Sequence, residues 1–203
     1  MDSLLEKIIH SPKLPIYFKE IQNLLEEEQQ KRQRFYEEMT EQEKAEFIEG
    51  KIVVHSPVKK WHNETCGNIY SLIKLHNQIY QLGFVGFEKI LVRFTRNDYE
   101  PDICFFKKEK STGFTDGQMF FPAPNFVAEI LSESTEKHDR AIKFEDYALH
   151  GVEEYWLVHP EEKYVEQYFL KEGRITSTAI KDFSIPIQAI FEEKENLKTL
   201  QGF

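Results

Sequence analysis

Three carboxylic acids stand among apolar residues, at positions where a folded chain is expected to bury them. Glu46 alternates with aliphatic residues, Asp102 follows a proline before the apolar run ICFF, and Glu129 interrupts the apolar segment NFVAEIL. Burying a carboxylate costs on the order of several kcal/mol unless a metal ion, a cation or hydrogen bonds compensate it. Magnesium is held by few carboxylates and several waters, so Asp102 and Glu129 on neighbouring strands would suffice as ligands. For any one acid alone, a salt bridge or a strand-end hydrogen bond explains the position equally well.

Two further residues carry side chains suited to phosphate chemistry, and each also has a plainer explanation. On a helical wheel Lys143 lies in a polar arc with Asp139 and Asp146, as a solvated lysine or an Asp139–Lys143 pair would. A helix side that faces a cleft would be polar too, so both interpretations stay open. His62 lies near the start of a predicted helix, where a histidine hydrogen-bonded to the backbone is expected.

The elements that must position these residues follow from periodicity. Residues 46–55 alternate with a period of two and turn near Gly50, which predicts a hairpin with Glu46, Ile48, Ile52 and Val54 on one face. Helical spacing predicts helices at 16–44, 57–83 and 136–149. Apolar runs predict strands at 84–94, 101–106, 125–131, 154–158 and 164–170, a loop at 107–124, and a covering strand with a short helix in the tail KDFSIPIQAIF.

The order strand, helix, strand over residues 125–158 predicts a crossover unit and therefore an α/β mixed sheet. A chain of 203 residues with 40% hydrophobic and 30% charged residues is expected to form an ordinary globular core. No apolar run approaches the roughly 20 residues that span a bilayer, so we expect no membrane segment. Two cysteines and no signal-like start favour a cytoplasmic protein.

The net charge of −9 argues against a protein that binds nucleic acid by electrostatic attraction alone, since such proteins carry a basic face. Residues 1–50 hold seven Lys and Arg against twelve Asp and Glu, so more than half of the negative excess lies there. A bound divalent cation would also let an acidic protein accept a phosphate substrate, because the ion supplies the local positive field.

The dipeptide Pro101-Asp102, followed 27 positions later by Glu129-Ile130-Leu131, resembles the PD-(D/E)XK nuclease signature, although Leu131 replaces the usual lysine. Within that superfamily the chain resembles the Uma-two family of endonuclease-like proteins from about Glu46 to Leu170. The matching segments are EFIEGKIVVHSP with His62 after it, EPDICFF, and FPAPNFVAEILSESTEKHDRAIKFEDYALHGVEEYWLV.

The resemblance implies a restriction-endonuclease-like fold, a mixed β-sheet flanked by helices, over residues 45–203, after an N-terminal helical extension at 1–44. It implies that Asp102 and Glu129 bind magnesium, with manganese as a possible substitute, and that Lys143 takes the place of the missing lysine. Glu46 becomes the amino-terminal acid of the catalytic site. His62 matches a family histidine and becomes a candidate for substrate contact.

The activity that follows is metal-dependent hydrolysis of phosphodiester bonds in DNA. A homodimer is expected, because symmetric pairs are the commonest soluble oligomer and many nucleases of this superfamily pair to cut two strands. Two alternatives stay open: a non-catalytic interaction or regulatory module on the same fold, or a metal hydrolase that acts on RNA or small phosphoesters. The acidic charge and the missing lysine at position 131 favour the first of these alternatives.

Overall fold

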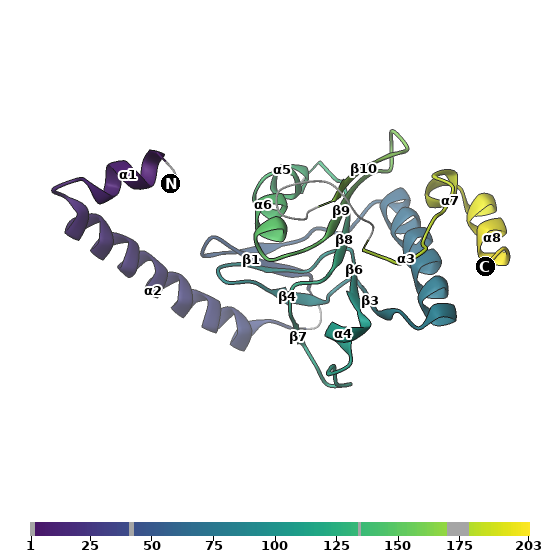
Figure 1. Ribbon diagram of the computed structural model, residues 1–203, viewed down its shortest axis with the longest axis horizontal. Coiled ribbons are helices and arrows are strands. Elements are labelled where there is room, and N and C mark those ends of the chain that lie inside the picture. The colour runs from purple at the N-terminus through teal and green to yellow at the C-terminus, as the bar shows by residue number, and fades with distance from the viewer. Residues whose placement is uncertain (1–2, 41–42, 134, 170–178) are drawn as a thin grey trace. The chain divides into compact units, whose positions relative to one another are not determined.

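The computed structural model describes residues 3–40, 43–133, 135–169 and 179–203 (Figure 1). The chain divides into two compact units, Met1–His55 and Ser56–Phe203. The predicted domain boundary between residues 44 and 45 stays a prediction.

The N-terminal unit consists of two helices and a hairpin. Helix α1 spans Ser3–Ile9 and α2 spans Leu14–Glu38, with Pro15 in the first turn, where its missing N–H is not needed. The long helix predicted at 16–44 is therefore confirmed but ends at Glu38. The hairpin strands are β1 (Ala45–Ile48) and β2 (Lys51–Val54).

The hairpin turn corrects the predicted faces. Glu49 (φ 48°) and Gly50 (φ 76°) both have the left-handed backbone that a two-residue hairpin turn requires. The strands pair Glu46 with Val53 and Phe47 with Ile52, and cross-strand partners lie on one face. Ile52 and Val54 therefore share a face with Phe47, and the prediction that they share one with Glu46 is wrong, because the two-residue turn reverses the alternation.

The larger unit is built on a five-stranded mixed sheet. Its strand order is β10-β9-β8-β6-β3, where β8 and β9 are parallel and the other pairs antiparallel. The strands are β3 (Gly83–Phe87), β6 (Ile103–Lys107), β8 (Phe126–Ile130), β9 (Glu154–His159) and β10 (Tyr164–Phe169). The predicted mixed sheet and the crossover from β8 to β9 are confirmed.

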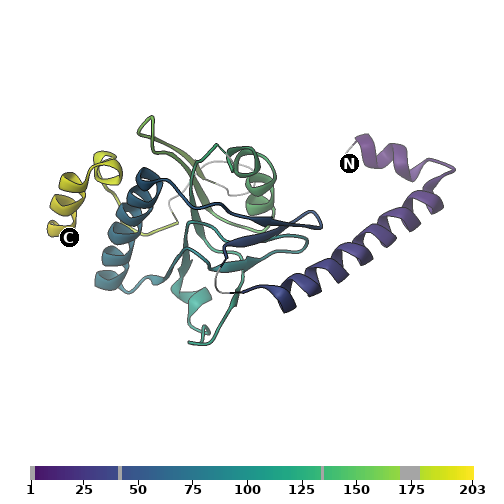
Figure 2. The same ribbon diagram turned by 180° about the vertical axis from the view of Figure 1, so that it is seen from behind.

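Helices cover both faces of this sheet, as the two opposite views show (Figures 1 and 2). Helix α3 (Lys60–Tyr80) packs on one face, where Cys66 and Ile69 join Ile130 and Trp156 in the main hydrophobic core. Helices α7 (Gln188–Phe191) and α8 (Glu193–Gln201) pack against α3. Helices α5 (Glu136–Arg140) and α6 (Ile142–Leu149) lie on the other face, toward which alternate residues of β8 point.

A second sheet contains β4 (Leu91–Arg93), which pairs antiparallel with β5 (Asp98–Tyr99) and parallel with β7 (Phe120–Phe121). The single strand predicted at 84–94 is therefore wrong. The chain leaves the main sheet at Glu88 (φ 50°) and Lys89 (φ 31°), whose left-handed backbone ends β3. The predicted loop at 107–124 contains β7 and the short helix α4 (Lys108–Ser111).

Two other predictions need correction. The helix predicted at 136–149 is interrupted at Ala141, whose φ of −112° and ψ of −90° are not helical. The described residues of the tail, 179–203, contain helices but not the predicted covering strand. Among the helices that the structure describes, none is long and apolar enough to cross a membrane.

A surface ion-pair network ties α5 to the β9–β10 hairpin. Arg140 Nη2 donates to Glu166 Oε1 at 2.6 Å, and His159 Nε2 lies 2.7 Å from the same oxygen. The Arg140 guanidinium, helped by Tyr168 and His159 and opposed by burial, lowers the pKa of Glu166 from 4.5 to about 2. Because the folded-state pKa is the lower one, the network stabilises the fold above about pH 4.5 and loses its contribution as the pH falls toward 2.

Replacing Glu166 with Gln should lower the free energy of unfolding by about 1 kcal/mol at pH 7, because a charge-assisted pair becomes a neutral hydrogen bond. The variant should also lose less stability than the wild type between pH 4.5 and pH 3. Urea unfolding at several pH values measures both effects. Glu162→Gln, an exposed change in the same hairpin, is the control. An unchanged acid slope in Glu166→Gln would contradict this assignment.

Candidate active site

The two predicted metal ligands lie side by side on neighbouring strands. The antiparallel register that pairs Ile103 with Ala128 places Asp102 opposite Glu129, one position further along. The Ile130 N–H donates to Asp102 Oδ2 at 2.9 Å, and the Asp102 N–H donates to Glu129 Oε2 at 3.3 Å. Both acids are buried, with 5% and 3% of their surface exposed. Each carboxylate is thus held by the main chain of the other acid's strand.

Lys143 joins this pair from α6. Its Nζ lies 3.1 Å from Glu129 Oε1 and 3.1 Å from Asp139 Oδ1, and the residue is only 2% exposed. The interpretation of Lys143 as a solvated surface lysine is therefore wrong. The alternative, an Asp139–Lys143 pair, is confirmed. One ammonium group compensates two buried carboxylates, and its role in catalysis stays a prediction.

Two tyrosines lie beside Glu129 and Lys143, Tyr147 against the carboxylate and Tyr99 against the ammonium group, and neither was identified from sequence. Tyr147 donates its hydroxyl hydrogen to Glu129 Oε1 at 2.9 Å. The Tyr99 ring lies 5.6 Å from Lys143 Nζ and 5.5 Å from the Tyr147 ring, and its hydroxyl donates to Asp146. For Tyr147 the available signal was the spacing of four between positions 139, 143 and 147, since residues so spaced share one helix side.

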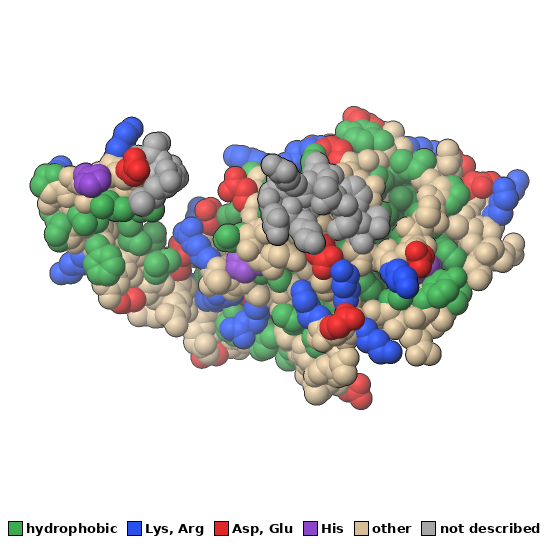
Figure 3. Space-filling view, viewed as in Figure 1, with side chains coloured by type: hydrophobic (Ala, Val, Ile, Leu, Met, Phe, Trp, Pro, Cys, Tyr) green, Lys and Arg blue, Asp and Glu red, His purple; other side chains and the backbone are tan. Residues whose placement is uncertain are grey.

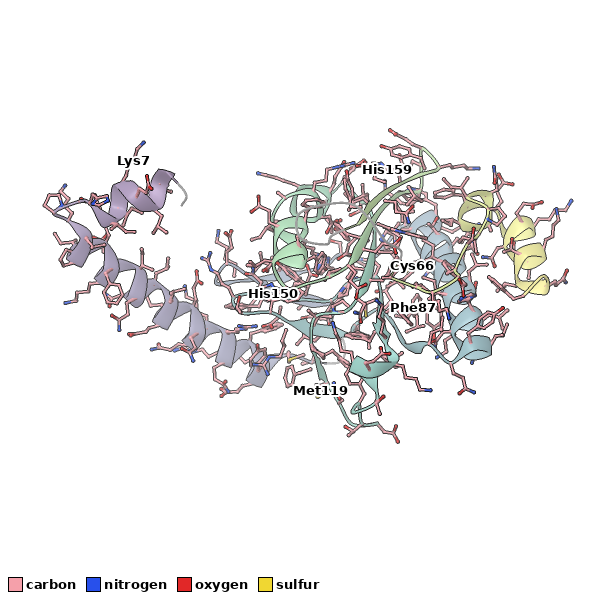
Figure 4. The ribbon with its side chains drawn as sticks, viewed as in Figure 1. Lys7, Cys66, Phe87, Met119, His150 and His159 are labelled. Carbon is pink, nitrogen blue, oxygen red and sulfur yellow. The ribbon has the colours of Figure 1, made fainter. Side chains whose placement is uncertain are left out.

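His62 approaches the acids from the opposite face of the sheet. It lies in the first turn of α3, 4% exposed, with Nε2 3.4 Å from Asp102 Oδ2. One turn later is Cys66, which is labelled in Figure 4. Its thiol lies 3.8 Å from the Asp102 carbonyl oxygen. His62 Nδ1 is buried without a hydrogen-bond partner among the described residues, so the expected bond from this ring to the backbone is not found there.

Glu46 belongs to the N-terminal unit. It is 1% exposed, and its Oε2 lies 3.1 Å from His55 Nε2. Its role as the amino-terminal acid of the catalytic site stays a prediction.

The oxygen donors fit a hard cation that keeps several waters. Among the described residues no group of three or more His, Cys, Asp or Glu is arranged to hold a metal ion, so a closed protein cage is not present there. Two adjacent carboxylates match the preference of magnesium for few protein ligands. Burial, together with the negative charge of Glu129, raises the pKa of the neighbouring Cys104 thiol, which disfavours the thiolate that a metal would require.

A mixed sheet with helices on both faces, and two acids meeting where β6 begins and β8 ends, define a restriction-endonuclease-like domain. The family model of Uma2, described as "Putative restriction endonuclease", matches residues 30–195. The chain therefore belongs to the Uma2 family. The predicted family and the predicted fold class are both confirmed.

Two relatives accompany this match. The chain is 30% identical over 120 residues to "Uncharacterized protein sll1609" of Synechocystis sp., covering 57% of this chain and 66% of that protein, just under two thirds of its length. The fold is similar to the crystal structure of "a putative nuclease belonging to DUF820" from Anabaena variabilis, with a TM-score of 0.58 and 21% identity over 77% of this chain and 90% of that chain. At that identity the likeness shows the fold.

Replacing Lys143 with Met should lower the free energy of unfolding by about 3 kcal/mol at neutral pH, because Glu129 and Asp139 lose their shared cation while still buried. Urea unfolding at pH 7 measures this difference. Lys137→Met, an exposed change on α5, is the matched control, and an equally small effect of both substitutions would sink the interpretation.

Proposed function

We propose that this protein is a magnesium-dependent endonuclease that hydrolyses phosphodiester bonds in DNA, acting in the cytoplasm as a homodimer. The observation that carries the proposal is the reciprocally hydrogen-bonded pair of Asp102 and Glu129, with the Lys143 ammonium group 3.1 Å from Glu129. Membership of a restriction-endonuclease family supports the same chemistry. Manganese is expected to replace magnesium, because it also accepts oxygen ligands.

Asp102 and Glu129 are the residues that would hold the ion. When bound, such an ion polarises the scissile phosphate and lowers the pKa of a coordinated water. The protein's own contribution is to hold both carboxylates in a fixed orientation. The N–H groups of Ile130 and Asp102 stabilise the negative oxygens and prevent the two side chains from turning away from each other.

Lys143 would position the attacking water and offset the charge that develops on the phosphate in the transition state. Its ammonium group is held in place by Glu129 and Asp139, so little reorganisation is needed when the substrate binds. His62, which touches Asp102 and has a free second nitrogen, would contact a phosphate oxygen or hold Asp102 in its orientation. Glu46 would complete the site as the amino-terminal acid.

The charge distribution is compatible with a DNA substrate. Residues 51–203 hold nineteen Lys and Arg against twenty-three Asp and Glu, a net of −4, whereas residues 1–50 carry −5. The part of the chain that contains Asp102 and Glu129 is therefore the less acidic part by composition. A cation held at the two acids would reduce the remaining repulsion of the DNA backbone.

One observation favours a second candidate, a non-catalytic module on the same fold. Lys143 and Tyr147 already satisfy Glu129 without any metal ion, so these residues would also make sense as a structural cluster. An enzyme that acts on RNA or on small phosphoesters would use the same groups. A metal-binding and cleavage assay separates the three functions.

Asp102→Asn should abolish magnesium binding and reduce cleavage about 100-fold or more, because the amide keeps an oxygen for the Ile130 N–H but lacks the charge that holds the ion. We would titrate magnesium and manganese calorimetrically. The same samples would then be incubated with plasmid, single-stranded DNA, RNA and a nitrophenyl phosphodiester. Asp116→Asn, an exposed change of the same chemistry, should behave as wild type.

If wild-type protein binds no metal and cuts none of these substrates, the proposal of nuclease activity is overturned and the non-catalytic module is favoured. Cleavage confined to RNA or to the small phosphoester would show that this compound, and not DNA, is the class of substrate. Asp102→Asn protein that binds and cuts as wild type would show that the site lies elsewhere.

A further inference from the structure

One side of α2 carries a stripe of residues spaced alternately by four and three. This spacing is that of the a and d positions of a coiled coil, which form one continuous seam along a helix. The seam consists of Leu14, Phe18, Ile21, Leu25, Glu28, Arg32 and Phe35.

The hairpin of the same unit covers the C-terminal half of the seam. Phe35 is 2% exposed and its ring stacks on that of Phe47 at 5.9 Å. Glu28 is 6% exposed and lies so close to the turn that a side-chain carbon at Gly50 would be 2.8 Å from its Cγ. This half of the seam is therefore already used as packing surface.

The N-terminal half of the seam has no such cover within its unit. Phe18 is 65% exposed, Ile21 and Leu25 are each 49% exposed, and Leu24 beside them is 50% exposed. Figure 3 shows hydrophobic side chains gathered over α1 and the start of α2. Together with Leu14, these residues leave on the order of 500 Å² of largely apolar surface exposed per chain, as much as the largest patch on a typical monomer.

We propose that a second copy of this chain covers this surface, by antiparallel pairing of residues 14–25 of the two α2 helices. Two copies would together bury about 1,000 Å², the lower bound for a specific protein interface. The exposed half of the seam continues directly from the half that packs against the hairpin. Such continuity is expected if the exposed half is a packing surface too. The family match begins at residue 30, so this surface lies outside the matched region.

The charges of α2 favour a protein partner over a membrane. Helices that lie on membranes carry Lys and Arg on their polar face. Helix α2 contains four Lys and Arg against six Glu, which would repel an anionic bilayer. At the seam itself, the uncovered positions are all apolar.

The antiparallel direction follows from what the seam contains beyond residue 25. A parallel pair would place Glu28 opposite Glu28 and Arg32 opposite Arg32, and like charges in a seam are destabilising. In a parallel pair the C-terminal halves of the two seams would also face each other. Each of these halves is already covered by the hairpin of its own copy. An antiparallel pair instead places Phe18 opposite Ile21 and Leu14 opposite Leu25.

This inference names the surface of the homodimer proposed above, and it does not require the catalytic centre to be active. The oligomeric state and the cleavage assay are therefore independent measurements. Asp102→Asn should remain dimeric even though it does not cut, so a failure of the nuclease proposal leaves the dimer surface standing, and the reverse also holds.

The test measures molar mass by light scattering of full-length protein at about 50 μM, where an interface of this size should be populated. Wild-type protein should have twice the 24.2 kDa of one chain. The double substitution Ile21→Glu with Leu25→Glu should give the mass of a single chain, because the dissociation constant of the dimer should rise at least 100-fold. The matched control is Asn23→Glu with Gln30→Glu, which adds the same charge on the exposed polar side and should remain dimeric.

A disulfide test checks the direction and does not depend on the charged variants being folded. An equimolar mixture of Leu14→Cys and Leu25→Cys proteins should form a crosslinked pair under mild oxidation, whereas neither alone should. The native Cys66 and Cys104 are buried and should not interfere.

Monomeric wild-type protein would overturn the proposal, as would a dimer that survives the Ile21→Glu and Leu25→Glu changes. Crosslinking of Leu14→Cys with itself would overturn the antiparallel direction. Sedimentation of the wild type, but not of the double Glu variant, with vesicles of phosphatidylcholine and phosphatidylglycerol would replace the second copy by a membrane surface.

Discussion

The compensation of one buried carboxylate organises the larger unit. Glu129 lies in a central strand whose other residues are apolar, so its charge must be stabilised locally or the strand would not remain buried. Two parts of the chain supply the three stabilising groups: the Asp102 N–H comes from the residue just before β6, and the Lys143 ammonium and the Tyr147 hydroxyl both come from α6. The register of β6 against β8 and the placement of α6 over the sheet are therefore both tied to the carboxylate of Glu129.

This arrangement joins stability to chemistry. In the proposed nuclease the Lys143 ammonium group would have to lie close to the acids, and the same closeness offsets part of the cost of burying them. A site so compensated can be fully formed before any ion or substrate arrives, which reduces the reorganisation needed for the reaction. Because the same contacts stabilise the buried acids and would arrange them for catalysis, a structural cluster and a catalytic centre can look alike in the absence of a ligand.

Much of this arrangement was predictable from sequence because it depends on local pattern. The apolar run around Glu129 and the following helical segment identify a β–α–β crossover, and antiparallel neighbours bring Asp102 to it. Tyr147 was missed, since a tyrosine on a helix that packs against a sheet is fully explained by core packing. The break at Ala141 and the left-handed residues Glu88 and Lys89 were missed as well, because non-glycine residues adopt these conformations only when tertiary packing imposes them.

The hairpin turn makes one glycine important for a residue it does not touch. At φ 76°, and with Glu28 packed against it, Gly50 cannot be exchanged for a larger residue without strain and displacement. The two-residue turn that it permits sets the register of β1, and a slip by one residue would turn Glu46 to the opposite face. Evolutionary change at residue 50 is therefore restricted by the chemistry expected of residue 46.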